Sequence, residues 1–216
     1  MKPDSSYNYR GGNQLSNEHL MPKTNRGIQT RNKLLRSAEY IIGKEGYHQS
    51  SITEITKHAG VSLGNFYTYF ESKYQIFEAL LLDMQGELMH KLKRRTAGLE
   101  NRIEIEREGF KAFFEFLKAR PYCLSLFPQA EYVDKELHRR IIEKFAKPYI
   151  ARLEDSIANG EIRAVNAEML VYSFMGITNY IGLKWVLWDE KEVDDQLIDE
   201  VMDFIKYGIM PNESSN

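Results

Sequence analysis

The chain has 216 residues, of which 43% are hydrophobic and 28% are charged, and its formal net charge at pH 7 is only −2. This mixture is typical of a soluble globular protein with a real core, and it excludes a chain that is disordered or strongly basic throughout. The single cysteine, Cys123, excludes an internal disulfide framework and a cysteine-cluster zinc site. We interpret it as a small apolar side chain.

The N-terminal part of the chain is the more basic part. Residues 1–75 hold ten Lys and Arg against six Asp and Glu, whereas residues 76–216 hold 19 against 25. A basic front on an acidic body is the pattern expected when one end of a protein faces phosphate.

Residues 1–27 are rich in Ser, Asn, Gly and Tyr and show no periodicity, which predicts a disordered arm. Arg10, Lys23 and Arg26 lie in it, and we favour a solvated tail over an arm that enters a minor groove. No apolar run follows the first residues, so no signal peptide is expected and the predicted location is cytoplasmic.

Residues 28–44 predict the first helix, which Gly46 ends. One face of it carries apolar residues at helical spacing. These are Leu34, Leu35, Ala38, Ile41 and Ile42.

Three helix-start signals follow within residues 50–75. Ser51 and Ser72 each stand three residues before a Glu or Gln (Glu54 and Gln75), which is the capping-box pattern. Between them, Ser62 begins a short run with Phe66 and Phe70 spaced i, i+4, which we assign to the core. Gly60 suits the left-handed turn between the first two helices. Two short helices joined by such a turn are typical of a DNA-binding helix-turn-helix. The alternative is a small helical bundle without DNA contacts.

The second short helix favours DNA binding, because its exposed side lacks the Glu and Lys of an ordinary solvated face. Small residues let a helix lie deep in a major groove, and Asn and Thr side chains reach base edges. The exposed residues are Leu63, Gly64, Asn65, Thr68 and Tyr69.

The rest of the chain predicts further helices over residues 72–95, 103–120 and 134–159. Pro121 closes the second of these, and a short apolar piece, residues 122–127, ends at Pro128. Pro148 is expected to kink or break the third.

Residues 166–188 predict a helix that is apolar almost all round, followed by an acidic loop and an amphipathic helix that ends near Gly208. Polar residues inside the apolar helix and amphipathic neighbours argue against a membrane span. A helix that is apolar on every side is buried on every side, so one side needs a partner.

Residues 59–73, AGVSLGNFYTYFESK, resemble the signature of the tetracycline-repressor (TetR) family of bacterial transcription regulators. Residues 41–55, IIGKEGYHQSSITEI, are similar to the segment that precedes it in that family, and the match is ungapped over residues 28–82. Beyond these residues, only the architecture is similar.

No strand pattern is visible in the sequence, which predicts an all-α protein. The resemblance implies that a three-helix DNA-binding head at residues 28–74 stands on a helical effector-binding and dimerisation body at residues 75–210, with residues 211–216 as a disordered tail. The last two long helices would pair with those of a second copy in a homodimer.

The resemblance also assigns DNA contacts residue by residue. Thr53, Leu63, Gly64, Asn65 and Thr68 fall on positions that approach bases, although an apolar Leu63 can meet only a thymine methyl. The positions that contact phosphates are Ser51, Ser62, Tyr67, Tyr69 and Lys73.

The aromatic and Met-rich body suits a cavity for a small, largely apolar effector. The alternative is that each of these side chains is simply core. The candidate lining comprises Phe113, Phe116, Tyr122, Phe127, Tyr172, Met175, Asn179, Tyr180 and Trp185.

We therefore predict a transcriptional regulator, most simply a repressor, that binds a palindromic DNA operator as a homodimer and is released by the effector. A DNA-binding protein without an effector and an all-α enzyme are the alternatives. Against an enzyme, there is no Cys/His pair and no Gly-rich phosphate loop, and the histidines are scattered. No metal, cofactor or membrane partner is expected.

Overall fold

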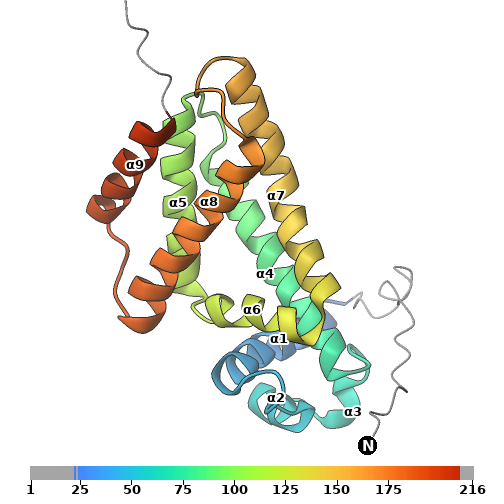
Figure 1. Ribbon diagram of the computed structural model, residues 1–216. Helices are drawn as coiled ribbons and strands as arrows, with labels where there is room; N and C mark the ends of the chain where they lie inside the picture. Colours follow the sequence, from blue (N-terminus) through green and yellow to red (C-terminus); the bar gives the residue numbers. More distant parts are fainter. Residues whose placement is uncertain (1–21, 23, 210–216) are drawn as a thin grey trace, which may run out of the picture.

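The computed structural model describes Pro22 and residues 24–209, and within these residues it is built of helices without a strand. Figure 1 shows three helices at one end of an elongated helical body. We call the segment α1–α3 the head and the segment from α4 to α9 the body. Most of the predicted arm and all of the predicted tail lie outside the described residues.

The head contains α1 (Asn25–Glu45), α2 (Ile52–Ala59) and α3 (Leu63–Phe66), and α4 (Lys73–Arg95) leads from it into the body. The C-terminal boundary of the predicted arm, residue 27, is corrected, because Thr24 caps α1 by accepting from the Gly27 N–H at 3.1 Å. The helix therefore begins inside the segment predicted as disordered. The predicted apolar face of α1 is buried, with Leu34, Ala38 and Ile42 fully so.

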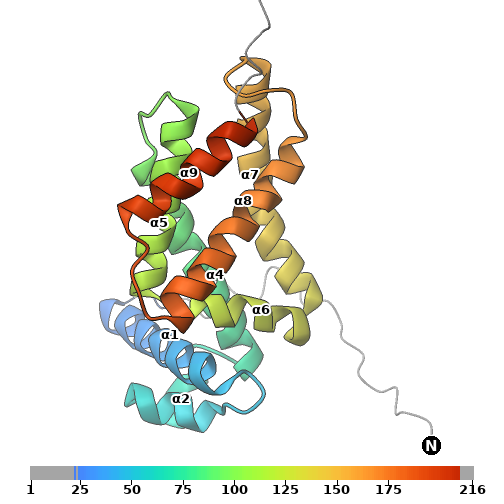
Figure 2. The ribbon, with the colours of Figure 1, turned by 60° about the vertical axis from the view of Figure 1, so that its left-hand side comes forward.

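The body contains α5 (Arg102–Ala119), α6 (Cys123–Val133), α7 (Lys135–Ala158), α8 (Ala167–Ile181) and α9 (Asp195–Ile209). Helix α4 runs against α5 and α7, and α9 packs on the outside of α5. Figure 2 shows α8 and α9 on one outer face of the body. The buried apolar side chains form one continuous cluster from the head to the far end of the body.

The segment expected to end at Pro128 continues as a helix, and Pro148 does not break the helix that contains it. Helix α6 continues through Pro128 to Val133, and α7 continues through Pro148 to Ala158. Both proline rings lie on exposed faces, where water can satisfy the carbonyl that loses its partner. In α6 the neighbouring Leu126 and Ala130 are fully buried, so packing outweighs the lost hydrogen bond.

The long apolar helix also differs from the prediction. Its α-helical part, α8, ends at Ile181, and a π-helical segment, Gly182–Trp188, follows it. Its first residue lies close to α5: a Cβ on Gly182 would lie 2.4 Å from Leu117 Cδ1. A larger residue at this position would require the Leu117 side chain to shift. Among the described residues, no helix is both long and apolar enough to cross a lipid bilayer.

Candidate nucleic-acid interface

Helix α2 begins with a closed capping box. Glu54 Oε2 accepts from the Ser51 backbone N–H at 2.8 Å, while Ser51 Oγ accepts from the Glu54 N–H at 3.2 Å. Each bond satisfies a backbone donor that the first turn of a helix leaves free. The capping box predicted at the start of α2 is thus confirmed, and the start of this helix is fixed locally.

The turn and the second helix follow the sequence signals. Gly60 has φ 64° and ψ 35°, the left-handed conformation, and its N–H bonds to the end of α2. Ser62 Oγ accepts from the Asn65 N–H at 3.2 Å and begins α3. The helix proper ends at Phe66, and turn bonds carry the coil on to Phe70. Phe66 and Phe70 are buried, as predicted, and anchor α3 to the head.

The outer side of α3 is open to solvent. Leu63 and Tyr67 are 47% and 50% exposed, and a Cβ added at Gly64 would meet nothing within 4 Å. The exposed members of the predicted DNA-binding set are Thr53, Ser62, Leu63, Gly64, Asn65, Tyr67 and Thr68. They gather on α3 and the start of α2, at the end of the molecule away from the body (Figure 1).

Asn65 and Thr68 contact each other. The Thr68 hydroxyl lies 2.6 Å from the Asn65 carbonyl oxygen and 3.1 Å from Asn65 Oδ1. A bidentate contact to adenine uses both the oxygen and the nitrogen of an Asn side chain. Because an amide oxygen can accept two hydrogen bonds, the Thr68 contact leaves Asn65 Oδ1 able to accept from a base as well.

Ser51, Tyr69 and Lys73 are only partly exposed. Tyr69 lies beside the start of α1, where its hydroxyl would be 3.7 Å from a Cβ on Gly27. We therefore place these three residues at the border of the exposed face of α3 and not on the face itself.

Lys73 points inward, in contrast to a simple phosphate contact. Its ammonium donates to the carbonyl oxygens of Tyr47 and Ser50 at 2.6 and 2.8 Å and lies 4.5 Å from the centre of the Tyr47 ring. Partial burial lowers the pKa of this ammonium, against the opposing field of Glu54. Lys73 therefore fastens the loop between α1 and α2 to the start of α4.

The start of α4 shows a partial capping box. Ser72 Oγ accepts from the Gln75 N–H at 3.1 Å, as predicted. The carboxamide oxygen of Gln75 accepts from the Glu71 N–H at 2.6 Å, one residue before the cap.

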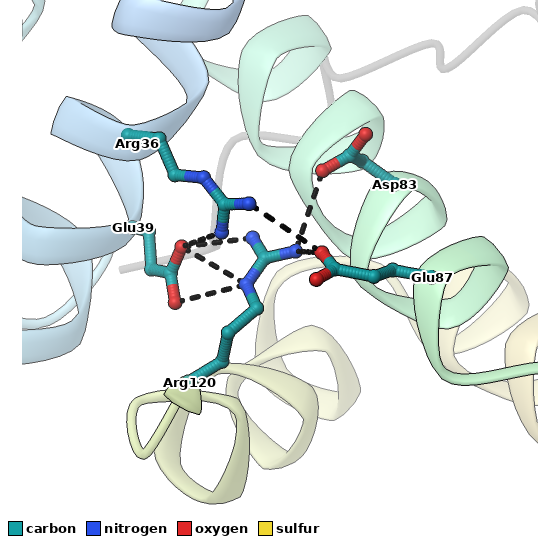
Figure 3. A network of polar contacts seen from close by, with 5 residues as sticks. All are labelled: Arg36, Glu39, Asp83, Glu87 and Arg120. Atoms are coloured by element: carbon teal, nitrogen blue, oxygen red, sulfur yellow. Dashed lines mark hydrogen bonds and ion pairs between the residues drawn. The ribbon is translucent and has the colours of Figure 1, made fainter. Parts of the chain in front are cut away.

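A charged network that the sequence did not predict joins the head to the body (Figure 3). Arg120, at the end of α5, binds Glu39 of α1 through Nη2 at 2.8 Å. Its Nη1 lies 2.5 Å from Glu87 and 3.4 Å from Asp83, both on α4. Arg36 adds a contact to Glu39 at 3.3 Å. Because the partners are far apart in sequence, no local pattern could indicate them.

Two other contacts hold the same joint. The Tyr47 backbone N–H donates to Gln129 Oε1 of α6 at 2.6 Å. A Cβ on Gly43 would lie 2.5 Å from the Tyr122 ring, so α1 and that ring are in direct contact. The head is thus fastened to the body along α1 as well as through α4.

The predicted effector lining is not brought together as one pocket. Phe116 is buried in the core, whereas Tyr172, Asn179 and Tyr180 lie on the exposed face of α8. The remaining members, Phe113, Tyr122, Phe127, Met175 and Trp185, are partly buried. The apolar pattern of residues 166–188 did not indicate which side faces inward, and this is why the candidate list mixes interior and exterior side chains.

Two clefts of the described structure lie elsewhere, along α1. One, of about 410 Å³, lies between α1 and α4 and is lined by residues such as Leu35, Leu82 and Gly86. The other, of about 560 Å³, lies between α1 and α2. No residue of the predicted effector lining borders either cleft.

The interior of the body holds a buried polar group as well. Arg102 Nη2 lies 2.6 Å from Glu106 Oε1, and the Tyr149 hydroxyl donates to the same carboxylate. Burial raises the pKa of Glu106 above its ordinary value, although Arg102 opposes the shift. Within the described part of the chain, no group of three or more His, Cys, Asp or Glu is arranged to hold a metal ion.

Comparison with known proteins agrees with this arrangement. Residues 34–80, which include α2 and α3, match the profile of the bacterial regulatory proteins, tetR family. The chain is 25% identical over 187 residues to the fatty acid metabolism regulator protein of Bacillus subtilis, covering 82% of this chain and 94% of that protein. The structure of FadR from Bacillus subtilis in complex with stearoyl-CoA superposes with a TM-score of 0.73 at 21% identity, covering 81% and 96% of the two chains.

The uncharacterized HTH-type transcriptional regulator YvdT of Bacillus subtilis is 33% identical over 192 residues, covering 86% of this chain and 97% of that protein. Identity at this level over most of both chains, with the family profile lying on the capped helix-turn-helix, shows that this protein belongs to the tetR family of bacterial transcriptional regulators.

Proposed function

We propose that the protein is a homodimeric repressor that binds a palindromic operator and is released by a largely apolar effector. The observation that carries the DNA-binding part is the exposed outer side of α3, with a glycine, an asparagine and a threonine on a helix anchored by buried Phe66 and Phe70. A helix of this kind fits into a major groove. Its site of action is then the bacterial cytoplasm.

In this proposal the exposed residues divide between bases and backbone. Asn65 and Thr68 read base edges, with Thr53 at the neighbouring helix start, while Leu63 meets a thymine methyl and Gly64 allows close approach. Ser51, Ser62, Tyr67 and Tyr69 contact phosphates, and Lys73 acts by holding the loop that positions α2.

The homodimer is supported by apolar side chains that α8, the π-helical segment and α9 expose. Helix α9 buries Ile198, Met202 and Ile205 against the body, yet it also exposes Phe204 by 73%. Large exposed apolar patches of this kind mark protein–protein contacts. The exposed residues are Met169, Tyr172, Tyr180, Trp188, Phe204 and Tyr207.

An effector with an apolar tail is supported by the interior of the body and by the relatives. Aromatic rings such as Phe110 and Phe174 pack there, and two buried polar atoms, Gln85 Oε1 and Arg102 Nε, have no hydrogen-bond partner among the described residues. Unpaired buried polar atoms are rare in native proteins. Because one structural relative binds stearoyl-CoA, we propose a long-chain acyl thioester as the first effector to test.

Selection of duplexes from a random-sequence library, followed by sedimentation of the complex, tests the DNA-binding proposal. The expected result is an inverted repeat bound by two chains of 25.3 kDa each. A protein that enriches no sequence, or that sediments only as a monomer at micromolar concentration, would contradict it.

The effector is tested separately by thermal shift with acyl-CoA esters of increasing chain length. A ligand at 100 times its Kd raises the stability of the native state by about 2.7 kcal/mol. By reciprocity, a saturating operator must weaken ligand binding by the same factor as the ligand weakens operator binding. Equal ligand affinity with and without operator would favour a DNA-binding protein that no effector regulates.

A further inference from the structure

Arg120 of the body contacts Glu39 of the head beside a cleft between α1 and α4. We propose that Arg120 is a positioning residue that sets the place of the head, and with it the spacing between half-sites that the dimer accepts. This inference rests on the proposed function, because spacing has a meaning only for a dimer that binds two half-sites.

The backbone of Arg120 is fixed to the body on both sides. Its N–H donates to the Phe116 carbonyl at 2.9 Å, and its own carbonyl accepts from the Cys123 N–H at 3.1 Å. Arg120 directly follows α5, and two residues separate it from the start of α6. Any shift between α5 and α6 therefore moves the base of this side chain.

The guanidinium of Arg120 is 2% exposed and holds the head through Glu39. Nη2 lies 2.8 Å from Glu39 Oε2, and Nε lies 3.2 Å from both carboxylate oxygens. Charge-assisted contacts of this forked kind fix direction as well as distance. On the other side, Nη1 reaches Asp83 and Glu87 of α4, so one side chain connects three helices (Figure 3).

Helix α1 transmits its position to the DNA-binding helices. It packs directly on α2, and the rings of Tyr40 and His58 stack at 4.8 Å across that contact. His58 Nδ1 also lies 2.9 Å from Ser37 Oγ of α1. Because α2 and α3 are joined by the short Gly60 turn, α3 follows α1.

A cleft separates α1 from α4 beside this network, although the two helices pack against each other elsewhere. The cleft of about 410 Å³ between the two helices is lined by Arg36, Asp83, Glu87 and Gly86, among others. Because this cleft is open, the charged contacts constrain the position of α1 relative to α4 at this point. Without Arg120, Arg36 of α1 would keep its contacts to Glu39 at 3.3 Å and to Glu87 of α4 at 3.5 Å, but its side chain is 56% exposed, so water screens this remaining link between the helices.

The half-site spacing that a dimer prefers depends directly on how its two heads are placed relative to each other. One added base pair separates the half-sites by about 3.4 Å and rotates them by about a tenth of a turn. A dimer with fixed heads discriminates strongly against this change, whereas one with loosened heads does not.

The experiment measures Kd for the duplex that the wild-type protein selects and for duplexes with one base pair added or removed between its half-sites. The variants are Arg120→Met and the milder Glu39→Gln, which removes the charge on the head side without changing size. Arg95→Met is the matched control, because it removes an arginine that joins two helices within the body, α4 and α5, through Glu108 and Glu115. All are measured at a temperature where circular dichroism shows them folded.

The spacing preference is the ratio of Kd for the altered duplexes to Kd for the selected duplex. We expect Arg120→Met and Glu39→Gln to reduce this ratio roughly 5- to 10-fold, which is at the lower end of the usual coupling between distant sites. Arg95→Met should keep the wild-type preference. An unchanged preference in both joint variants, or an equal reduction in all three, would overturn the inference. If Arg120→Met does not fold, Glu39→Gln decides alone. A wild-type protein that shows no spacing preference would instead contradict the proposed dimer on two half-sites.

Discussion

Replacing Lys73 by Ala tests whether this lysine acts inside the head or on DNA. In the structure its ammonium donates to two carbonyl oxygens at 2.6 and 2.8 Å and lies over the Tyr47 ring. Losing a partner costs about 1–3 kcal/mol for each buried acceptor. Ser50 is buried, but Tyr47 is partly exposed, so water can replace part of the second contact.

The expected loss of stability is therefore about 2–3 kcal/mol, with the lost cation–π contact included. For a chain of this length that corresponds to a fall in Tm of about 4–12 °C. Thermal and urea unfolding measure the loss directly, and Lys57→Ala, at an exposed lysine of α2, is the control that should leave Tm unchanged.

The same variant separates the two roles in a DNA-binding assay. A lysine that neutralises one phosphate contributes about one unit to the slope of log K against log salt. If Lys73 acts by holding the loop, the folded variant keeps the wild-type slope. Unchanged stability with a slope reduced by about one unit would refute the internal role and support the phosphate contact that the family resemblance implies.

Three further predictions concern the groove face, the dimer and the cysteine. Asn65→Ala should lose about 1–3 kcal/mol of discrimination at one base pair with the salt slope unchanged, which selection from a library would reveal. Tyr180→Glu, at a side chain 70% exposed, should give monomers that bind the operator weakly; dimers of wild-type affinity would contradict the assigned face. Burial raises the pKa of the Cys123 thiol from 9.0 to about 12, so native protein should resist alkylation at pH 8 until it is unfolded. Because the folded state holds this proton more tightly, its contribution to stability is complete below pH 9 and is lost as pH rises towards 12.

Local signals in the sequence predicted the helix-turn-helix well. Ser51, Gly60 and Ser62 act through neighbours within a few residues, so their spacing alone predicts where α2 and α3 begin and end. The fold class and the core roles of Phe66 and Phe70 followed from the same patterns.

Features that depend on distant partners could not be predicted. Arg120 and Glu39 are 81 residues apart, and neither belongs to a recognisable pattern. Pro128 was expected to stop a helix because the sequence does not show that its ring faces solvent. For the same reason the candidate effector lining mixes interior and exterior side chains: an apolar helix does not show which of its sides, such as that of Tyr180, faces outward.

The contact between Gly43 and Tyr122 makes one backbone position unusually vulnerable to genetic change. A side chain as small as that of alanine would lie 2.5 Å from the ring of Tyr122, so α1 would have to move away from α6. Such a mutant would carry an intact groove-facing helix in a displaced position. In a selection for cells that express the regulated gene constitutively, substitutions at Gly43 should then appear beside those in α3. They would differ from the α3 substitutions by retaining the wild-type base preference within each half-site.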